Sequence, residues 1–484
     1  MRFTPHLSSR IPFLSIVFLL PLLAFAQPDT LWMREFDNGG DDYATIVMPT
    51  NNGDFVFAGS SWHDVSMNMQ LTRTDANGTE VWSQDYGTAQ NDWCNGMIPV
   101  AAGGWLLGGF TFPPNSFFPN IILVRAAENG DTLWTRIIGD SAISETANAM
   151  VELSDGGFLV LGIRDLSQSG LLDAYLLRLN SFGDTLWTRT YVLPDNEDAS
   201  NLCELADGNY LISGAFTNDN NGSDFYFVKI NPVGDVLWTR SYGGAGFDLV
   251  QDAKALPDGG AVFAGLTDSF GEMGDLYLGR INGSGDTLWT HTYGGDDEDH
   301  AHTLALTSDG GFLVGGHTDS FGSVNGDVYL VKTGSDGNAQ WVFTQPGPDY
   351  ESFESMQQTG DGGVILVGNH IVESVGSNML LLRLDNITSA PGEFIPHPSS
   401  LILSSYPNPF NAAATITFVL PQSDHVRLNV FDLSGRAVAT LTDAVYSAGE
   451  HRLNVDASRW PSGTYLYRLE TSSSSVQKKM VLIK

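Results

Sequence analysis

Seven of the chain's eleven tryptophans recur at a nearly constant interval. They stand at positions separated by steps of 50 to 53 residues: Trp32, Trp82, Trp134, Trp187, Trp238, Trp289 and Trp341. A sequence period of this size is typical of repeat architectures, in which each unit buries its apolar surface only against its neighbours. The chain is therefore expected to consist largely of packed copies of one unit.

The sequence of one repeat unit predicts four short strands. In the unit that ends with Trp341, residues 301–307, 312–317 and 327–333 form three short runs separated by Gly- and Asp-rich turns, and Trp341 lies in a fourth run. Runs rich in β-branched and aromatic residues with such turns favour an antiparallel meander. A sheet of this kind has two apolar faces and needs a neighbour on each side.

Counting the units predicts how the repeat closes. Turns of the Asp-Gly-Gly kind occur at Gly53, Gly103, Gly156, Gly208, Gly259, Gly310 and Gly362. The first Trp strand, residues 30–36, precedes every other strand, and the last three strands have no Trp strand after them. If the first Trp strand pairs with the last three strands, the ring closes and no sheet edge is left exposed. We therefore predict an all-β, seven-bladed β-propeller with one-plus-three strand closure over residues 27–386. A β-helix or an open solenoid needs no such leftover strand and fits less well.

The units resemble the SBBP-type bacterial β-propeller repeat. The likeness is clearest in Leu237-Trp238-Thr239-Arg240-Ser241-Tyr242-Gly243-Gly244, Asp248, Asp258-Gly259-Gly260 and Asp275-Leu276-Tyr277. The second and third units depart from this pattern, with Ala102-Gly103-Gly104 and Ile138-Gly139-Asp140. The resemblance implies a fold and no particular activity.

Composition excludes several classes of protein. The chain has 56 Asp+Glu against 23 Lys+Arg and a net charge of −33, so a nucleic acid or an anionic lipid surface would repel it. Its 42% hydrophobic residues are enough for a large core, which excludes disorder. Cys94 and Cys203 lie in different repeats and are expected to be small buried hydrophobes.

Basic residues follow the repeat. One base recurs at an equivalent position in each unit: Arg73, Arg125, Arg178, Lys229, Arg280, Lys332 and Arg383. Another stands two residues after four of the tryptophans: Arg34, Arg136, Arg189 and Arg240. Only Arg164 and Lys254 remain in residues 27–400. We therefore predict that these bases form the same structural pair in every unit. Too few other bases remain for a sialidase-like cluster of arginines that would bind a substrate carboxylate.

Acids and amides recur at two further positions, which an alternating meander places on the same end of each sheet. Six stand fourteen residues before Trp, namely Asn68, Asn120, Asp173, Asp224, Asp275 and Asp327; six stand about ten after it, namely Asp42, Asp92, Asp198, Asp248, Asp299 and Glu351. One interpretation is that they accept bonds from loop N–H groups. The alternative is Ca²⁺, which takes oxygen ligands, although no contiguous D-x-D-x-D-G loop is present.

A glycine stands four residues before six of the repeat tryptophans. The positions are Gly78, Gly130, Gly183, Gly234, Gly285 and Gly337. This spacing resembles the tryptophan-docking turn of quinoprotein propellers, where the turn joins neighbouring blades. We therefore expect the tryptophans to pack between blades, and no quinone-cofactor constellation accompanies them.

Residues outside the repeat pattern are the candidate ligand contacts. They lie in loops expected on one face of the ring: Trp62, His63, Trp93, Phe112, Phe117 and Phe118. Exposed aromatics beside carboxylates suit a sugar ring or a peptide. The alternative is that they fill gaps between blades.

A second candidate is a transition-metal site near residue 300. His300 and His302 are expected to point to one side of a strand, with Asp296 or Asp299 as a further ligand. Spacing alone fixes no third ligand.

No enzyme motif is evident. Nothing matches G-x-S-x-G, a Walker loop, a Cys/His dyad or H-E-x-x-H. A glycosidase needs two carboxylates at a defined separation. Because the chain has so many acids, the sequence does not identify which two would form such a pair. Three hypotheses follow: a glycan- or protein-binding adhesion module, an extracellular polysaccharide hydrolase of the endoglucanase or another glycosidase type, and a spacer without a ligand.

The N-terminus predicts export. Arg2 and Arg10 precede the apolar residues 11–25, and Ala24-Phe25-Ala26 forms an A-x-A cleavage site. This arrangement is typical of a secretory signal peptide, here residues 1–26. The apolar run is too short to span a bilayer, and no later segment is long enough, so we expect an exported monomer without a transmembrane segment.

The C-terminal part changes character. Residues 387–400, with Pro391, Pro396 and Pro398, are expected to be a linker. Residues 401–484 contain 8 bases and 6 acids, so the negative charge belongs to the preceding region. Alternating runs at 415–420, 426–431, 451–455, 464–469 and 479–483 predict a small immunoglobulin-like β-sandwich.

Four ordered motifs in this part resemble the type A sorting domain of the type IX secretion system, which is also similar to flagellar hook-capping domains. The signal residues are Pro407, Asn408, Pro409, Gly463, Tyr465, Lys478, Lys479 and Lys484. The resemblance implies a Bacteroidetes-like envelope, an outer-membrane translocon and a surface transpeptidase as partners, and a secreted or outer-membrane surface location reached through the periplasm.

Overall fold

The computed structural model describes residues 28–482 apart from short segments at 64, 141, 166–171, 192–196, 218–221, 272–273, 322–325, 346–348, 373–375, 386, 388–401, 407–409, 421–423, 434, 447–448 and 472–474. The described residues contain strands and no helix, so none of them forms a helix that could cross a membrane. The predicted signal peptide and all of the predicted linker except Ile387 lie outside the described residues.

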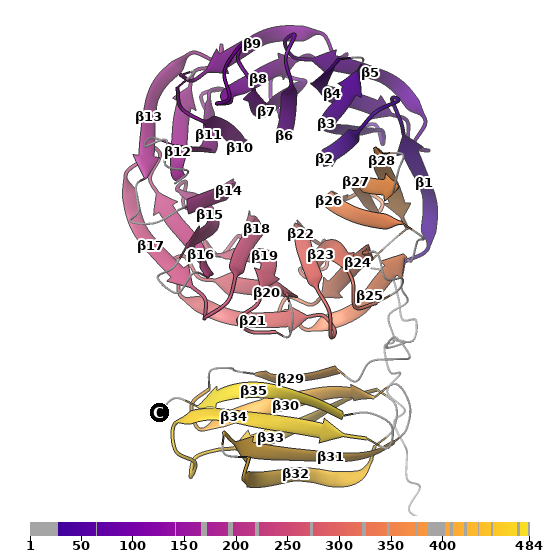
Figure 1. Cartoon of the computed structure of the whole chain (residues 1–484), viewed down its shortest axis with the longest axis vertical. Helices are drawn as coiled ribbons and strands as arrows, with labels where there is room; N and C mark the ends of the chain where they lie inside the picture. The colour runs from indigo at the N-terminus through magenta and orange to yellow at the C-terminus, as the bar shows by residue number, and fades with distance from the viewer. Residues whose placement is uncertain are drawn as a thin grey trace, which may run out of the picture.

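The described residues up to Leu384 form seven four-stranded antiparallel sheets arranged in a ring (Figure 1). In six of them, consecutive strands pair in chain order. Sheet 1 contains β2 (Asp42–Pro49), β3 (Phe55–His63), β4 (Ser66–Thr74) and β5 (Glu80–Tyr86); sheet 2 contains β6 (Asp92–Pro99), β7 (Trp105–Thr111), β8 (Asn120–Ala126) and β9 (Thr132–Ile138); sheet 3 contains β10 (Glu145–Glu152), β11 (Phe158–Arg164), β12 (Asp173–Leu179) and β13 (Thr185–Tyr191). Sheet 4 contains β14 (Glu197–Glu204), β15 (Tyr210–Thr217), β16 (Ser223–Ile230) and β17 (Val236–Tyr242); sheet 5 contains β18 (Asp248–Ala255), β19 (Ala261–Thr267), β20 (Asp275–Ile281) and β21 (Thr287–Tyr293); sheet 6 contains β22 (Asp299–Leu306), β23 (Phe312–Thr318), β24 (Asp327–Thr333) and β25 (Ala339–Gln345).

Sheet 7 combines the two ends of the repeat region. It contains β26 (Tyr350–Gln358), β27 (Val364–Val372), β28 (Gly376–Leu384) and, paired with β28, the first strand β1 (Thr30–Phe36). Just beyond the paired strands, the Asp29 N–H donates to Asp385 Oδ1 at 2.9 Å and the Asp385 N–H donates to the Asp29 carbonyl at 3.0 Å. The leftover strand therefore pairs where the count predicted.

The core of the ring lies between the sheets. Each of its hydrophobic clusters takes residues from two neighbouring sheets, as with Leu71 of β4 and Ile122 of β8, or Leu161 of β11 and Ile212 of β15. Because both apolar faces of a sheet are buried by its neighbours, no single repeat contains a complete core.

The outer strands connect neighbouring sheets through the repeat tryptophans. Gly285 has a φ of +85°, and a Cβ there would lie 3.0 Å from the Trp238 ring of the preceding sheet. Five more glycine–tryptophan pairs meet in the same way: Gly78–Trp32, Gly130–Trp82, Gly183–Trp134, Gly234–Trp187 and Gly337–Trp289. Tyrosine hydroxyls donate to the carbonyls of the same glycines, for example Tyr86 to Gly130 at 2.6 Å and Tyr191 to Gly234 at 2.9 Å. Glycine is required here by both its φ and this close approach.

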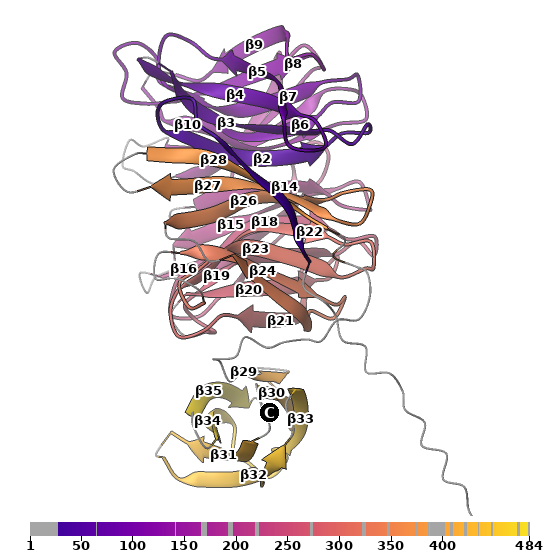
Figure 2. The ribbon, with the colours of Figure 1, turned by 90° about the vertical axis from the view of Figure 1, so that its right-hand side faces the viewer.

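The strands run between two ends of the ring (Figure 2). We call one end the turn face, because it carries the tight turns between the first and second strands and between the third and fourth strands of each sheet. We call the opposite end the loop face, because it carries the connections between second and third strands and between successive sheets.

Ion pairs recur on the turn face. The base near the end of each third strand reaches the aspartate of the first turn in its own sheet. The pairs are Arg73–Asp54, Arg178–Asp155, Lys229–Asp207, Arg280–Asp258, Lys332–Asp309 and Arg383–Asp361. Sheet 2 has Ala102-Gly103 at this turn, and Arg125 donates instead to the carbonyls of Gly103, Trp105 and Ala126.

The innermost strands share a β-bulge. Figure 1 places β2, β6, β10, β14, β18, β22 and β26 nearest the centre of the ring, and a register shift in each leaves one polar residue unpaired: Thr45, Asn95, Asn148, Ser200, Gln251, His302 and Glu354. In four sheets this residue donates to a carbonyl of the next innermost strand, as Thr45 does to Cys94 at 2.9 Å and Asn95 to Ala147 at 3.0 Å. The bulge residues thus connect sheets near the axis.

The C-terminal part forms two sheets that share one core. One contains β29 (Ile402–Tyr406), β30 (Ala413–Leu420) and β33 (Gly449–Asp456); the other contains β32 (Ala437–Tyr446), β31 (Asp424–Asp432), β34 (Gly463–Glu470) and β35 (Ser475–Leu482). Ile416 and Val430, from opposite sheets, belong to the same buried cluster. The sequence patterns predicted neither β29 nor β32; β32 is an outer strand without fully buried residues, so it lacks the clear alternation of a half-buried strand.

Candidate functional site

A groove of about 360 Å³ opens on the loop face across sheets 4, 5 and 6. Strand ends and the connections beside them supply its walls. The apolar part contains Phe216, Phe247, Leu249 and Leu266, and Phe247 is 56% exposed. A large, exposed aromatic side chain inside a concave site is a feature of ligand-binding surfaces.

The polar part of the groove is acidic. Asp198, Asp268 and Glu298 line it together with Thr217, Ser223 and His300, and no Lys or Arg occurs among the described lining residues. Carboxylate and hydroxyl oxygens accept hydrogen bonds from ligand hydroxyl or amino groups. The groove therefore suits a neutral or cationic ligand with an apolar surface.

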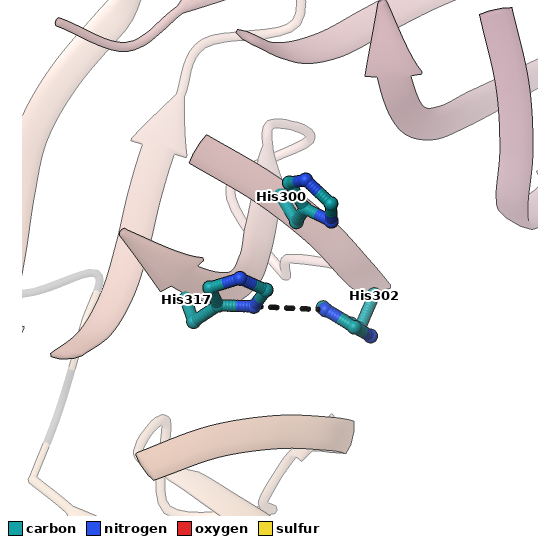
Figure 3. A group of neighbouring side chains, drawn as sticks. All are labelled: His300, His302 and His317. Carbon is teal, nitrogen blue, oxygen red and sulfur yellow. Dashed lines mark hydrogen bonds between the residues drawn. The ribbon is translucent and has the colours of Figure 1, made fainter. Parts of the chain in front are cut away.

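Three histidines gather beside this groove in sheet 6 (Figure 3). His300 and His302 come from β22 and His317 from β23, and one ring nitrogen of each lies within 4.8 Å of the others. His302 Nε2 is 3.1 Å from His317 Nδ1, and the His300 and His317 ring centroids are 4.7 Å apart. His300 and His317 are directly opposite in the strand register, and His302 is the bulge residue. The bulge re-aims its side chain toward the pair.

Sheet 7 supplies polar partners for this histidine cluster. His302 Nδ1 lies 3.2 Å from Glu354 Oε2, and the Tyr350 hydroxyl lies 3.2 Å from His317 Nδ1. Ser352 donates to Glu354 Oε1 at 2.9 Å. Glu354 is thus oriented from its own strand while it holds the ring of His302.

The three histidines of the cluster differ in the direction of their pKa shifts. Burial lowers the pKa of His302, but the hydrogen bond and charge of Glu354 outweigh burial and leave the pKa above 6.5. Burial and the nearby His302 and His300 lower the pKa of His317 to about 3. Burial, followed by His302, also lowers the pKa of His300. Within the cluster, a proton is therefore favoured on His302, which faces Glu354, over His317.

The metal ligands predicted beside the histidines are placed differently. The three-histidine group contains neither Asp296 nor Asp299 among the described residues. Asp299 accepts from the Thr318 hydroxyl, from Ser320 Oγ at 2.7 Å and from the Gly295 N–H at 2.7 Å. Adjacent residues of a strand face opposite sides, so Asp299 points away from the side that His300 occupies. The third histidine, His317, replaces it in the cluster.

The repeated acids bind loop backbone and hydroxyl groups. Asp248 accepts from the Gly244 N–H at 2.9 Å and from Thr267, and Asp92 accepts from the Thr88 N–H at 2.5 Å. Burial raises the pKa of both carboxyls. This geometry agrees with the interpretation that the acids hold loop backbone, while Ca²⁺ binding stays a prediction.

The predicted aromatic contacts divide between packed and exposed positions. Trp93 stacks with Phe110 at 6.1 Å and lies 5.7 Å from the Tyr43 ring, and Phe110 packs against Phe112 at 5.8 Å, so these rings fill the space between sheets 1 and 2. Trp62 and Phe117 are exposed, Phe117 by 93%, and Phe118 is half-buried. The side chain of His63 lies outside the described residues.

Sequence reasoning missed His317 and the walls of the groove. His317 was expected only as the end of a strand, and its pairing with His300 depends on the register of β22 and β23. Phe216 comes from the end of β15, whereas Phe247 and Asp268 come from two different connections. The signal that was available is local: Phe247 directly precedes the repeat acid Asp248 at a loop position.

The predicted sorting residues divide between described and undescribed positions. Tyr465 is buried in β34 and donates to the Pro461 carbonyl at 2.6 Å; Gly463 begins the same strand. Lys478 and Lys479 lie in β35, and Lys479 is exposed. Pro407, Asn408, Pro409 and Lys484 lie outside the described residues.

The C-terminal part matches a known family. Residues 404–484 fit the family described as the secretion system C-terminal sorting domain. This type IX secretion tail indicates export to the cell surface or secretion, and it implies interaction with the secretion machinery.

Similarity to curated proteins is partial. The chain is 28% identical over 171 residues to the regulatory protein FlaEY of Caulobacter vibrioides, and the match covers 30% of this chain and 18% of that protein. The chain therefore spans about a fifth of this curated relative's length.

Solved structures with a similar architecture differ widely in sequence. A puromycin hydrolase is 14% identical with a TM-score of 0.49, covering 82% of this chain and 62% of its own. A protein of unknown function from Dyadobacter fermentans is 12% identical with a TM-score of 0.44, covering 74% and 99%. PorZ, a surface component of the type IX secretion system of Porphyromonas gingivalis, is 10% identical with a TM-score of 0.28, covering 91% and 81%. Similarity at this level carries no argument about activity.

Proposed function

We propose that the chain is a seven-bladed β-propeller, followed by an immunoglobulin-like sorting domain, that is exported and binds a glycan at its loop face. The groove across sheets 4 to 6 is the observation that carries this proposal, because it places the exposed Phe247 beside Asp268 and Glu298. An aromatic ring can stack on the apolar face of a sugar while carboxylates accept its hydroxyl hydrogens.

The charge of the groove favours one class of glycan. Asp198, Asp268 and Glu298 would repel the carboxylate of a uronic or sialic acid. The same acids accept hydrogen bonds from neutral sugars and pair with amino sugars. A neutral or amino-sugar polysaccharide is therefore the ligand class that fits.

The export machinery supplies the second set of partners. The sorting tail would be recognised by the type IX translocon, and a surface transpeptidase would then remove it and leave the ring released or attached. The basic Lys478 and Lys479 lie on β35, at the described C-terminal end of this tail. The ring itself acts as a monomer in this proposal.

Binding of neutral and amino-sugar oligosaccharides by isothermal titration calorimetry tests the glycan proposal. We expect Phe247→Ala to weaken binding at least tenfold, because it removes the stacking surface, which corresponds to about 1.4 kcal/mol. Phe117→Ala is the matched control, since Phe117 is also an exposed phenylalanine but lies outside the groove residues.

Three outcomes contradict this proposal. Equal affinity of the parent chain and Phe247→Ala would remove the groove from consideration. Hydrolysis of the oligosaccharide during the titration would instead support the extracellular hydrolase hypothesis. Absence of binding across the whole panel would favour the spacer hypothesis.

A further inference from the structure

We propose that His300, His302 and His317 bind one Zn²⁺ ion. This site lies beside the groove, but the inference does not depend on glycan binding. It rests on the donor set, the nitrogen spacing, the second layer of partners and the departure of sheet 6 from the repeat.

The donor set selects the class of metal. Three imidazole nitrogens suit Zn²⁺ and related transition metals, whereas Ca²⁺ and Mg²⁺ require oxygen ligands. Zinc sites with three protein ligands keep a fourth position open for water or another ligand.

The nitrogen spacing fits such an ion. Two nitrogens bound to one tetrahedral zinc at about 2.0–2.1 Å lie about 3.3 Å apart. His302 Nε2 and His317 Nδ1 are 3.1 Å apart, and His300 brings a nitrogen within 4.8 Å of both. A modest rotation of the His300 ring would complete the set; this ring is the most exposed of the three, and its Nε2 lies 3.6 Å from Glu298 Oε2.

Glu354 provides the outer partner that metal-binding histidines usually have. Its carboxylate lies 3.2 Å from His302 Nδ1, so Nε2 is the nitrogen left to face a metal. Carboxylate partners of this kind fix the orientation of a ligand ring and increase its basicity. Ser352 and Asn369 contact the other oxygen of Glu354 at 2.9 and 3.4 Å, which orients the carboxylate itself.

The repeat does not account for these histidines. At the positions of His300 and His317, sheet 5 has Leu249 opposite Leu266 and sheet 2 has Trp93 opposite Phe110. At the bulge position of His302, five other sheets have Thr, Asn, Ser or Gln, and sheet 7 has Glu354. No other sheet has a histidine at any of these three positions, so the three imidazoles of sheet 6 indicate a local purpose.

An ion could reach the cluster from the loop face. The side chains of His300 and His302 are 28% and 21% exposed, while His317 lies beneath them. His300 also lines the groove. A metal held here would therefore lie at the edge of the groove, where a bound ligand can approach it.

Metal titration of the tag-free chain from Gln27 onward, after removal of metals with a chelator, tests the site. Calorimetry with ZnCl₂ is expected to give one ion per chain, and an excess of CaCl₂ or MgCl₂ is expected not to compete for this site. Co²⁺ in place of Zn²⁺ is expected to produce the visible absorption of a tetrahedral nitrogen site. Stoichiometric binding with this spectrum supports the proposal, and the absence of either overturns it.

Variants locate the ion. We expect His302→Gln and His317→Gln each to lower zinc affinity at least 100-fold, and Glu354→Gln to lower it about 10- to 100-fold. His425→Gln, an exposed histidine in the C-terminal part, should bind as the parent does. Thermal melting checks that each variant folds. If the folded His302 and His317 variants retain the parent affinity and Co²⁺ spectrum, the proposal is wrong; should either fail to fold, Glu354→Gln and the parent spectrum decide the question.

Discussion

The two faces of the ring use acidic residues in opposite ways. On the turn face, Asp309 pairs with Lys332; burial raises its pKa, but hydrogen bonds from Thr307 and Lys332 outweigh burial and hold the pKa below 3.8. On the loop face, burial raises the pKa of Asp248, and bonds from Thr267 and the Gly244 N–H only partly offset it. The turn-face Asp309 is thus paired with a base, whereas the loop-face Asp248 is buried against hydroxyl and backbone N–H donors.

This difference indicates that the repeated charged residues of the turn face stabilise the individual sheets. The bases that recur at the ends of the third strands are engaged in the turns of their own sheets. On the loop face, Asp92, Asp248 and Asp299 accept instead from hydroxyl and backbone N–H groups, and the connections vary in length and residue type. The groove and the histidine cluster both lie on this second face.

The largest effect is expected from removing a buried base on the turn face. Lys332→Ala should lower the free energy of unfolding by about 3 kcal/mol, because it leaves Asp309 and the Thr333 carbonyl without their cationic partner. The side chain of Lys332 is 0% exposed. Urea unfolding followed by tryptophan fluorescence measures the change.

Arg280→Ala is the matched control for this prediction. It removes the equivalent base in sheet 5, but both Arg280 and Asp258 are substantially exposed. Its cost should be about 1 kcal/mol or less. Equal losses for the two variants would contradict the view that burial of the base determines its contribution.

An intermediate effect is expected in the pH dependence of stability, with opposite signs on the two faces. Bonds from Thr359, the Gly363 N–H and Arg383 lower the pKa of Asp361 below 3.8. Its stabilising contribution is therefore present above pH 3.8 and is lost as the pH falls through the folded-state pKa. Asp361→Asn should cost about 1 kcal/mol at pH 7, and this cost should disappear in acid.

Asp248 has a raised pKa, so the sign is reversed. The protonated carboxyl is favoured in the folded ring, and stability present below pH 3.8 is lost as the pH rises through the folded-state pKa. Asp248→Asn should therefore gain stability relative to the parent as the pH rises. Urea unfolding between pH 3.5 and 7 measures both variants, and slopes of the same sign would refute the contrast between the faces.

The smallest effect is expected for exposed aromatics of the loop face. Phe117→Ser should change the free energy of unfolding by less than about 0.5 kcal/mol, because the side chain is 93% exposed. Thermal melting and urea unfolding check this. A clear loss of stability would mean that this aromatic supports the ring.

The ring was predictable because its determinants recur. The spacing of Trp238 from Gly234 and Gly285 recurs around the chain, and each copy reports the same packing between sheets. The leftover strand Thr30–Phe36 then required a partner, which β28 supplies. A single short strand is difficult to predict from its sequence, but seven copies of the same pattern make the prediction secure.

The candidate site was only partly predictable because it depends on register and on three-dimensional proximity. His300 and His302 share a strand, so their spacing was informative. His317 joins them only because β23 pairs with β22 at that residue, and the bulge at His302 cannot be located from composition. The groove collects Phe216, Phe247 and Glu298 from a strand end and two connections that are far apart in sequence.

The position of β28 has a mechanical consequence. β28 is the last strand before the C-terminal part, and it lies between β27 and β1 rather than at the edge of its sheet. When the C-terminal part is held at a surface, a pull on the ring is transmitted through β28. The hydrogen bonds to β27 and to β1 must then slip or break before β28 can be extracted. The strand that receives the force is therefore hydrogen-bonded to strands from both ends of the repeat region.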